Sequence, residues 1–144
     1  MLELKDVSVV FNEGTVNEKV ALNNINLALD KGDFVTIIGS NGAGKSTLFQ
    51  AISGAVDTKR GNIILNGRDI TFEPEYKRSK GIGRLFQDPL KGTAPNMTIE
   101  ENLHLSNQRG KHFSLSLMSH RHREEFKKAL MEFCLLYTSD AADE

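Results

Sequence analysis

The residues best suited to chemistry lie in one short run, in which glycines surround a lysine and two hydroxyl side chains. The run matches the pattern G-x-x-x-x-G-K-S/T and continues into a threonine; its members are Gly39, Ser40, Asn41, Gly42, Ala43, Gly44, Lys45, Ser46 and Thr47. Glycines allow a backbone to fold into a concave nest whose N–H groups point toward an anion. A helix that begins near Lys45 adds the partial positive charge of its N-terminus. The run therefore predicts a site for nucleotide phosphates.

Three side chains at the end of this run have a predicted task. Lys45 is expected to reach the β- and γ-phosphate oxygens as a point charge, and Ser46 is expected to bind Mg²⁺ through its hydroxyl. Thr47 is placed to donate toward the α-phosphate. The alternative is an accidental glycine-rich loop with no ligand.

The elements on either side of the run favour the phosphate site. The segment Phe34–Ile38 is nearly continuous in apolar, branched residues, which is typical of a strand covered on both faces. After the glycines, Leu48 and Ile52 lie at helical spacing, and Gly54 is a plausible C-terminal cap. Strand, glycine loop and helix form the first half of a βαβ unit.

The other elements follow from alternation and turn signals. Residues 2–11 and 20–29 alternate as half-buried strands, each with a change of phase that predicts a bulge, at Lys5-Asp6 and at Asn23-Asn24. A strand at 63–65 runs into the tight-turn pair Asn66-Gly67. The sequence further predicts a short helix over 74–80, a strand over 82–86, a loop over 87–96, a helix opened by the capping box at 98–101, and a helix over 121–133.

Composition indicates an ordinary water-soluble globular protein. Of 144 residues, 39% are apolar and 26% charged, and the net charge of −1 provides no field that would attract nucleic acid or an anionic membrane. No apolar run approaches the roughly 20 residues that cross a bilayer, and no secretory signal is visible. These features predict a cytoplasmic protein without a nucleic-acid partner.

The glycine run, from Asn41 to Leu48, resembles the Walker A segment of ABC ATPases. Residues 61–70 resemble the strand and turn that follow the Walker helix in that family, and the segment Phe86–Pro89 resembles its Q-loop. The resemblance covers residues 1–133. It implies an α/β fold of the P-loop NTPase class, the ABC-ATPase core: a mixed sheet with an antiparallel β subdomain over 1–97, and the start of the helical subdomain over 98–133, truncated.

The resemblance also implies ATP and Mg²⁺ as ligands and two further site residues. Phe11 ends the first strand, where the family usually has an aromatic residue stacked on adenine; tyrosine is commoner there, and a core aromatic on an edge strand is the alternative. Gln87 would approach Mg²⁺ and the attacking water, with an ordinary loop amide as its alternative. Lys45 and Gln87 are thus the expected catalytic residues, and Ser46 and Gln87 the expected metal ligands.

The tail Cys134–Glu144 resembles a translated sequencing adapter, so we expect it to be non-native, with the native reading frame interrupted near Phe133. The signature motif, Walker B and the switch histidine of the family do not occur before Glu144. A chain with only the phosphate cradle is expected to bind nucleotide weakly at best and not to hydrolyse it.

The resemblance implies a peripheral subunit on the cytoplasmic face of the membrane. Its expected partners are an integral membrane permease, a second ATPase subunit in a head-to-tail dimer, and a substrate-binding protein. Residues 14–22, 92–94 and 97–103 are similar to ATPases of tryptophan/tyrosine-type uptake systems. Two alternatives stay open: a soluble ABC ATPase acting in translation or DNA maintenance, and an inactive truncated nucleotide-binding fragment.

Overall fold

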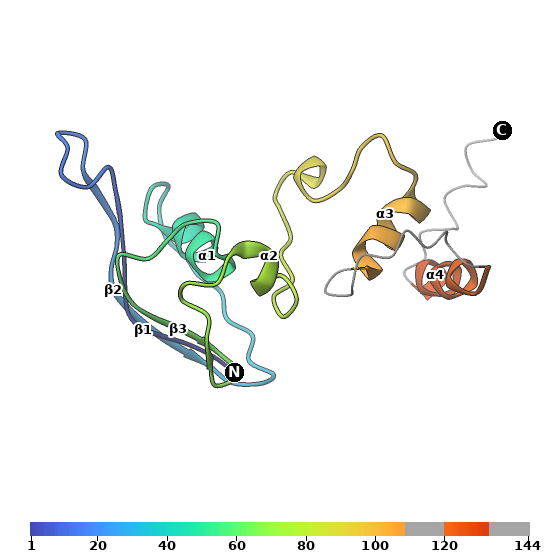
Figure 1. Cartoon of the computed structure of the whole chain (residues 1–144), viewed down its shortest axis with the longest axis horizontal. Helices are drawn as coiled ribbons and strands as arrows, with labels where there is room; N and C mark the ends of the chain where they lie inside the picture. Colours follow the sequence, from blue (N-terminus) through green and yellow to red (C-terminus); the bar gives the residue numbers. More distant parts are fainter. Residues whose placement is uncertain (109–119, 133–144) are drawn as a thin grey trace. The chain divides into compact units, whose positions relative to one another are not determined.

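The structure, a computed structural model, describes residues 1–108 and 120–132. The elements in chain order are β1 (Leu2–Phe11), β2 (Lys19–Leu29), α1 (Lys45–Ser53), β3 (Arg60–Leu65), β4 (Arg68–Asp69), α2 (Glu75–Arg78), the 3-10 helix η1 (Pro89–Lys91), α3 (Ile99–Asn107) and α4 (His120–Glu132) (Figure 1). The chain divides into two compact units, Met1–Arg84 and Leu85–Glu144, which are described in turn. The expected boundary between residues 97 and 98 stays a prediction.

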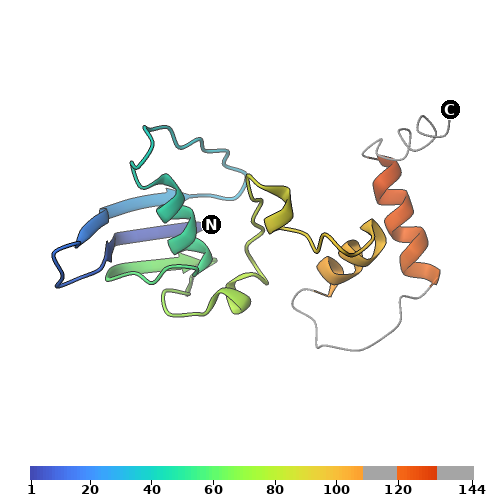
Figure 2. The same ribbon diagram turned by 90° about the horizontal axis from the view of Figure 1, so that it is seen from above.

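The first unit is an antiparallel sheet with helix α1 against one face. The strand order is β2-β1-β3-β4, and all three pairings are antiparallel. Figures 1 and 2 show α1 running across the sheet. The core forms where apolar side chains of the sheet meet those of the helix: Leu4, Val7, Val9, Leu22 and Ile63 from the strands, Leu48 and Ala51 from α1, and Ile70.

The two predicted bulges are confirmed. The β1–β2 register shifts between Leu4 and Val7, and again where Val9 pairs with Leu22. Asp6 and Asn24 have positive φ values of 51° and 49°, as an inserted residue requires. The Asn26 side chain holds the first bulge, since its Oδ1 accepts from the Asp6 N–H at 2.9 Å. The bulge lets Leu4 and Val7, three residues apart, both face the core.

Local turn chemistry also agrees with the sequence. Asn66 and Gly67 both have positive φ, 52° and 79°, and connect β3 to β4 as a two-residue hairpin. Gly54 caps α1 in the left-handed conformation, and its N–H donates to the Ala51 carbonyl at 3.2 Å. Helix α2 runs from Glu75 to Arg78 with Pro74 as its N-cap, so it is shorter than the predicted 74–80.

Two predicted strands are absent from the described structure. Phe34–Ile38 and Ile82–Phe86 have no strand assignment, and Phe34 and Ile38 are 94% and 90% exposed. The prediction that Phe34–Ile38 is covered on both faces is therefore wrong here. A buried strand needs neighbours for its N–H and carbonyl groups and apolar cover on each face. Within residues 1–108 and 120–132, no strand pairs with either segment.

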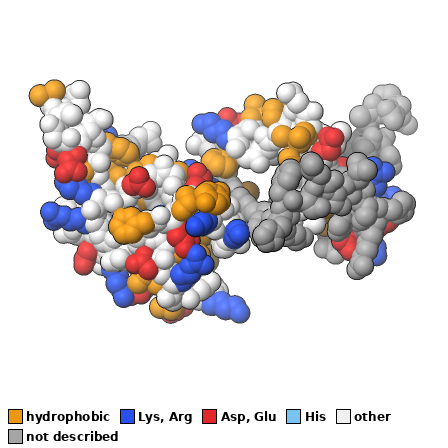
Figure 3. All heavy atoms as spheres, in the orientation of Figure 1, with side chains coloured by type: hydrophobic (Ala, Val, Ile, Leu, Met, Phe, Trp, Pro, Cys, Tyr) orange, Lys and Arg blue, Asp and Glu red, His pale blue; other side chains and the backbone are white. Residues whose placement is uncertain are grey.

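The apolar side chains of this unit are consequently not all in the core. Ile37 packs partly against the core cluster, whereas Val35 is half exposed. Figure 3 shows hydrophobic side chains interspersed with charged ones on the visible surface of the unit. The antiparallel part of the expected mixed sheet is thus present, and the described strands contain no parallel pairing.

The second unit contains η1, α3 and α4. The predicted capping box is confirmed: the Glu101 N–H donates to Thr98 Oγ1 at 3.3 Å, and the Thr98 N–H donates to Glu101 Oε2 at 2.8 Å. Helix α4 runs from His120 to Glu132, close to the predicted 121–133, and Phe133 lies outside the described residues. None of the helices described is both long and apolar enough to cross a membrane.

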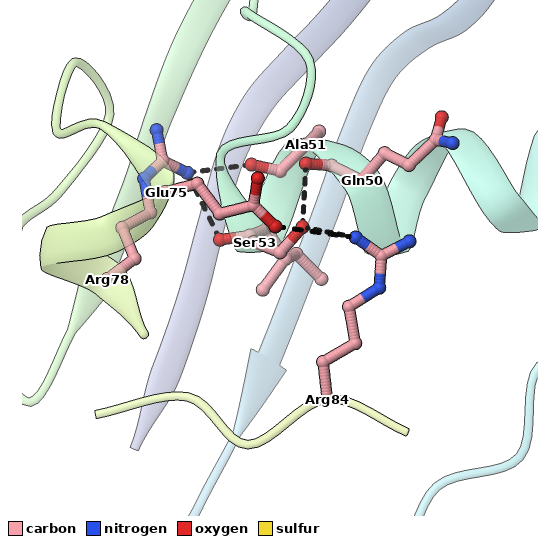
Figure 4. Close-up of polar contacts among 7 residues, drawn as sticks. Gln50, Ala51, Ser53, Glu75, Arg78 and Arg84 are labelled. Carbon is pink, nitrogen blue, oxygen red and sulfur yellow. Dashed lines mark hydrogen bonds and ion pairs between the residues drawn. The ribbon is translucent and has the colours of Figure 1, made fainter. Parts of the chain in front are cut away.

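A buried arginine joins the end of α1 to the rest of the first unit. Arg78 is only 3% exposed. Its Nη1 donates to the carbonyls of Ala51 and Ile52 at 2.7 and 3.1 Å, as Figure 4 shows. Its Nη2 donates to the Thr71 carbonyl, and its Nε to that of Glu73, both at 2.7 Å. Burial lowers the pKa of the Arg78 guanidinium, an effect that the negative charge of Glu73 opposes.

Replacing Arg78 by alanine is expected to lower the free energy of unfolding by about 3 kcal/mol, because the carbonyls it contacts lose their buried donor. Urea denaturation followed by circular dichroism measures the change. Lys77→Ala, on the exposed side of the same helix, is the control and should change stability by less than about 0.5 kcal/mol. Equal effects of the two substitutions would contradict a structural role for the Arg78 contacts.

A second prediction concerns the pH dependence of stability. The hydroxyl and N–H of Thr71 donate to Asp69 Oδ1 and, with the Asn62 amide on Oδ2, lower the pKa of Asp69. A carboxylate whose pKa is lower in the folded than in the unfolded chain stabilises the fold at pH values above the unfolded-state pKa, which is about 3.9 for aspartate. This stabilisation is lost as the pH falls through the folded-state pKa.

Asp69→Asn should therefore be less stable than the wild type at pH 7. This difference in stability should become smaller below about pH 4. Thermal unfolding at a series of pH values measures the stability of the wild type and of the variant. A difference that stays constant down to pH 2 would show that the Asp69 charge does not contribute.

Candidate phosphate-binding site

The glycine run forms the turn that leads into α1. Gly42 and Gly44 have φ values of 86° and 88°, with Ala43 between them. The Ala43 N–H donates to the Ser40 carbonyl at 3.2 Å and closes the turn. Such an alternation of backbone conformation turns successive N–H groups toward one concave side. The backbone therefore has the shape that a phosphate group needs.

Only glycine fits at position 44, because any other residue type would bring a Cβ into contact with strand β2. A Cβ on Gly44 would lie 2.6 Å from the Ala21 carbonyl oxygen and 3.1 Å from a methyl group of Leu22. The loop thus rests directly on strand β2 at the N-terminus of α1. This contact sets the position of the loop relative to the sheet.

Helix α1 presents an uncompensated positive end to the loop. It begins at Lys45, its N-cap is Gly44, and no side chain caps it. Its first turn contains no acidic residue. The first N–H groups of a helix have no partner within the helix, so they are available to an anion.

The Lys45 side chain extends from the start of α1 back to the beginning of the same loop. Its Nζ donates to the carbonyls of Gly39 and Ser40 at 2.6 and 2.7 Å. An ammonium group has three donors, and these two bonds account for two of them. The positive charge of Lys45 is therefore held against the backbone of the glycine loop; its contact with the β- and γ-phosphates stays a prediction.

The two hydroxyl residues lie in the first turn of α1. Ser46 is exposed and Thr47 is half-buried. A single hydroxyl suits Mg²⁺, which keeps several waters and takes its other oxygens from phosphates. Residues 1–108 and 120–132 contain no cluster of three His, Cys, Asp or Glu side chains able to hold a metal. The residues present fit a magnesium–nucleotide complex.

Phe11 lies at the end of β1, beside the part of β2 that contacts the loop. It pairs with Lys19, and Val9 pairs with Leu22, against which Gly44 rests. Phe11 is half-buried and packs partly against the core cluster. The alternative of a core aromatic thus has support, although β1 is a central strand and not an edge strand. Stacking on adenine stays a prediction.

Gln87 belongs to the second unit and lies two residues before η1. Its side chain is exposed and lies in a bend. The Asp88 that follows accepts a hydrogen bond from the Leu90 N–H at 3.0 Å, which starts the 3-10 turn. The approach of Gln87 to Mg²⁺ and water stays a prediction, because the phosphate loop lies in the other unit.

Sequence reasoning missed two arginines that lie at the far end of α1. Arg78 binds the backbone of the last turn, and Arg84 donates from Nη1 to Ser53 Oγ at 3.1 Å (Figure 4). Arginines among charged neighbours are typical of exposed surface. Only the burial of Arg78 distinguishes it, and burial of an arginine leaves no periodic signal in the sequence.

The geometry agrees with what the chain resembles. The sequence model of the ABC transporter family matches residues 22–141, a stretch that contains the phosphate loop and Gln87 and runs into the tail from Cys134. A tyrosine transport ATP-binding protein of Clostridioides difficile is 40% identical over 132 residues, which cover 92% of this chain and 52% of the relative. A phosphonates import ATP-binding protein of Lactobacillus gasseri is 46% identical, covering 60% of this chain and 33% of the relative.

Solved structures show the same fold. A dimeric ATP-binding cassette in a post-hydrolysis state with ADP and Pi matches with a TM-score of 0.74 and 25% identity, over 91% of this chain and 56% of that one. A nucleotide-free cassette from an ABC transporter matches with a TM-score of 0.64 and 31% identity, over 80% of this chain and 43% of that one. The chain spans about half the length of these relatives. Since the family match covers most of the chain, the protein belongs to the ABC transporter family and represents part of its ATP-binding domain.

Proposed function

We propose that the chain is the N-terminal part of the ATP-hydrolysing subunit of an ABC importer. The single observation that carries the proposal is the phosphate loop, in which the Lys45 ammonium lies over a glycine nest at the uncapped start of α1. Relatives named for tyrosine transport and for phosphonates and aliphatic sulfonates import support an import system.

In this proposal the residues of the first unit bind the nucleotide and hold its charge. The backbone of residues 39–44 and Lys45 bind the phosphates, Ser46 supplies one oxygen to Mg²⁺, and Phe11 lies beside the base. Bound Mg²⁺ neutralises the phosphate oxygens. Gln87 orients the attacking water.

The remaining catalytic groups are proposed to lie in the part of the relatives that this chain does not cover. The chain spans 52% of the tyrosine transport relative. The exposed apolar side chains of Phe34 and Ile38 support the same view, because a water-soluble protein gains by covering such residues. The 144-residue chain by itself is then a nucleotide-binding part without turnover, and the tail from Cys134 is non-native.

The proposed partners are those that the resemblance to ABC ATPases implies, and the dimeric cassette supports one of them, the second ATPase subunit. They are a membrane permease, a second ATPase subunit arranged head to tail, and a substrate-binding protein. The subunit would work at the cytoplasmic face of the membrane. An aromatic amino acid such as tyrosine is the proposed cargo, since the curated relative named for tyrosine transport matches nearly the whole chain.

Substitution of Lys45 by alanine should weaken binding of magnesium–ATP by roughly 10- to 100-fold, because charge-assisted bonds to the phosphates are lost. Titration calorimetry measures the affinity. Lys80→Ala, which removes an exposed lysine outside the loop, should leave it unchanged. Ser46→Ala should weaken binding only when Mg²⁺ is present. Unchanged affinity in Lys45→Ala would refute the phosphate site.

The source locus provides the second test. Reading native DNA past the codon for Phe133 should show the frame continuing into a signature motif, Walker B and a switch histidine, beside genes for a permease and a binding protein. A frame that encodes Cys134–Glu144 and then stops would overturn the proposed ATPase. Tandem ATPase domains in the continued frame would instead indicate a soluble ABC ATPase.

A further inference from the structure

The first unit contains an open pocket that the proposed function does not use. Its volume is about 600 Å³, which lies within the range of small-molecule sites. The described residues that line it all lie between positions 65 and 81, that is, in the β3–β4 hairpin, in α2 and in the chain next to them. None of them belongs to the glycine loop, so a ligand in this pocket would leave the phosphate site free.

The pocket carries an excess of positive charge. Among the described residues that line it, Arg68, Lys77, Arg78 and Lys80 are basic, and Glu73 alone is acidic. Glu73 forms an ion pair with Arg68, so its charge is balanced within the pocket. The ammonium groups of Lys77 and Lys80 are exposed and have no hydrogen-bond or ion-pair partner within residues 1–108 and 120–132. Two positive charges are therefore available to a ligand.

The buried Arg78 adds a further donor to the lining. A guanidinium has five N–H groups. Four hydrogen bonds join Arg78 to backbone carbonyls, which leaves at least one N–H group without an acceptor in the described part of the chain. The residue is 3% exposed, and a buried positive charge is costly unless negative charge lies nearby. An anion in the pocket would reduce this cost.

The same pocket has an apolar and aromatic part. Leu65 and Ile70 line it, and Ile70 belongs to the core. The Tyr76 side chain is 68% exposed, so its ring can pack against a flat group of a ligand. Polar groups that converge on an apolar surface are typical of a small-molecule site. The pocket thus combines donors for an anion with a surface for an apolar group.

We propose that this pocket binds a small organic phosphate, whose phosphate group is held by Lys77 and Lys80 and whose flat apolar part packs against Tyr76. A phosphate monoester carries about −1.5 to −2 charges at pH 7, which matches the two unpaired ammonium groups. A neutral ligand would leave these charges unmatched, and a cation would be repelled by them. The inference goes beyond ATP binding, because it assigns a second ligand to residues outside the phosphate loop.

Binding is tested on the full chain with phenyl phosphate, and with inorganic phosphate and benzyl alcohol as its two halves. In two-dimensional amide NMR, phenyl phosphate should shift the signals of residues 65–68 and 76–81. Its Kd should lie roughly tenfold below that of inorganic phosphate, because the ring packs against Tyr76. Benzyl alcohol should cause no comparable shifts. Inorganic phosphate or benzyl alcohol binding as tightly as phenyl phosphate would overturn the proposal.

Exposed substitutions identify the groups that hold the ligand. The double variant Lys77→Gln/Lys80→Gln should bind phenyl phosphate roughly tenfold more weakly, since two exposed charge contacts are lost. Lys31→Gln, which removes an exposed lysine in the turn after β2, is the matched control and should bind like the wild type. Tyr76→Ala should weaken the binding of phenyl phosphate but not of inorganic phosphate. Wild-type affinity in the double variant would overturn the assignment to this pocket.

Lys45→Ala separates the pocket from the phosphate loop. It should leave the binding of phenyl phosphate unchanged. Binding that disappears in Lys45→Ala but persists in the double lysine variant would place the ligand in the phosphate loop and overturn the inference. If the wild-type chain fails to bind magnesium–ATP while phenyl phosphate still shifts the signals of residues 65–68 and 76–81, the proposed function fails and the second site stands.

Discussion

Helix α1 leaves unsatisfied backbone groups at both ends, and the first unit is organised around the way each end is completed. At the C-terminus, the Gly54 N–H and the Arg78 guanidinium bind the free carbonyls of the last turn. At the N-terminus, no side chain caps the helix. One end is thus closed by the protein itself, and at the other the first N–H groups of the helix are available to an anion.

The loop at the open end of the helix lies directly on the sheet. Gly44 lies against the Ala21 carbonyl, and α1 contributes Leu48 and Ala51 to the core beneath it. The bulges in β1 and β2 keep Leu4, Val7 and Leu22 on the face that receives the helix. The helix therefore cannot move on the sheet without disturbing the core, and the phosphate loop acquires a fixed position from packing.

The apolar segment before the loop shows what a packed layer requires. Phe34–Ile38 has the composition of a buried strand, yet it pairs with no strand among the described residues and exposes Phe34 and Ile38. The chain spans about half the length of its relatives, and it matches the fold of a solved ATP-binding cassette over 91% of its own length. An apolar sequence pattern indicates that a segment is suited to burial. Whether the segment is buried depends on the presence of neighbouring strands and helices that cover it.

The amino-acid sequence by itself determined the features that depend on a few adjacent residues. The glycine run predicted the turn and the start of α1 at Lys45, the phase changes predicted both bulges, and Asn66-Gly67 and the Thr98–Glu101 box predicted a turn and a helix start. Each is a local conformational preference, so neighbouring residues suffice to specify it. The tertiary structure alone decided the burial of Arg78, the contact of Arg84 with Ser53, and the exposure of Phe34. These depend on groups far apart in the chain, and no spacing in the sequence records which carbonyl or hydroxyl a long side chain will reach.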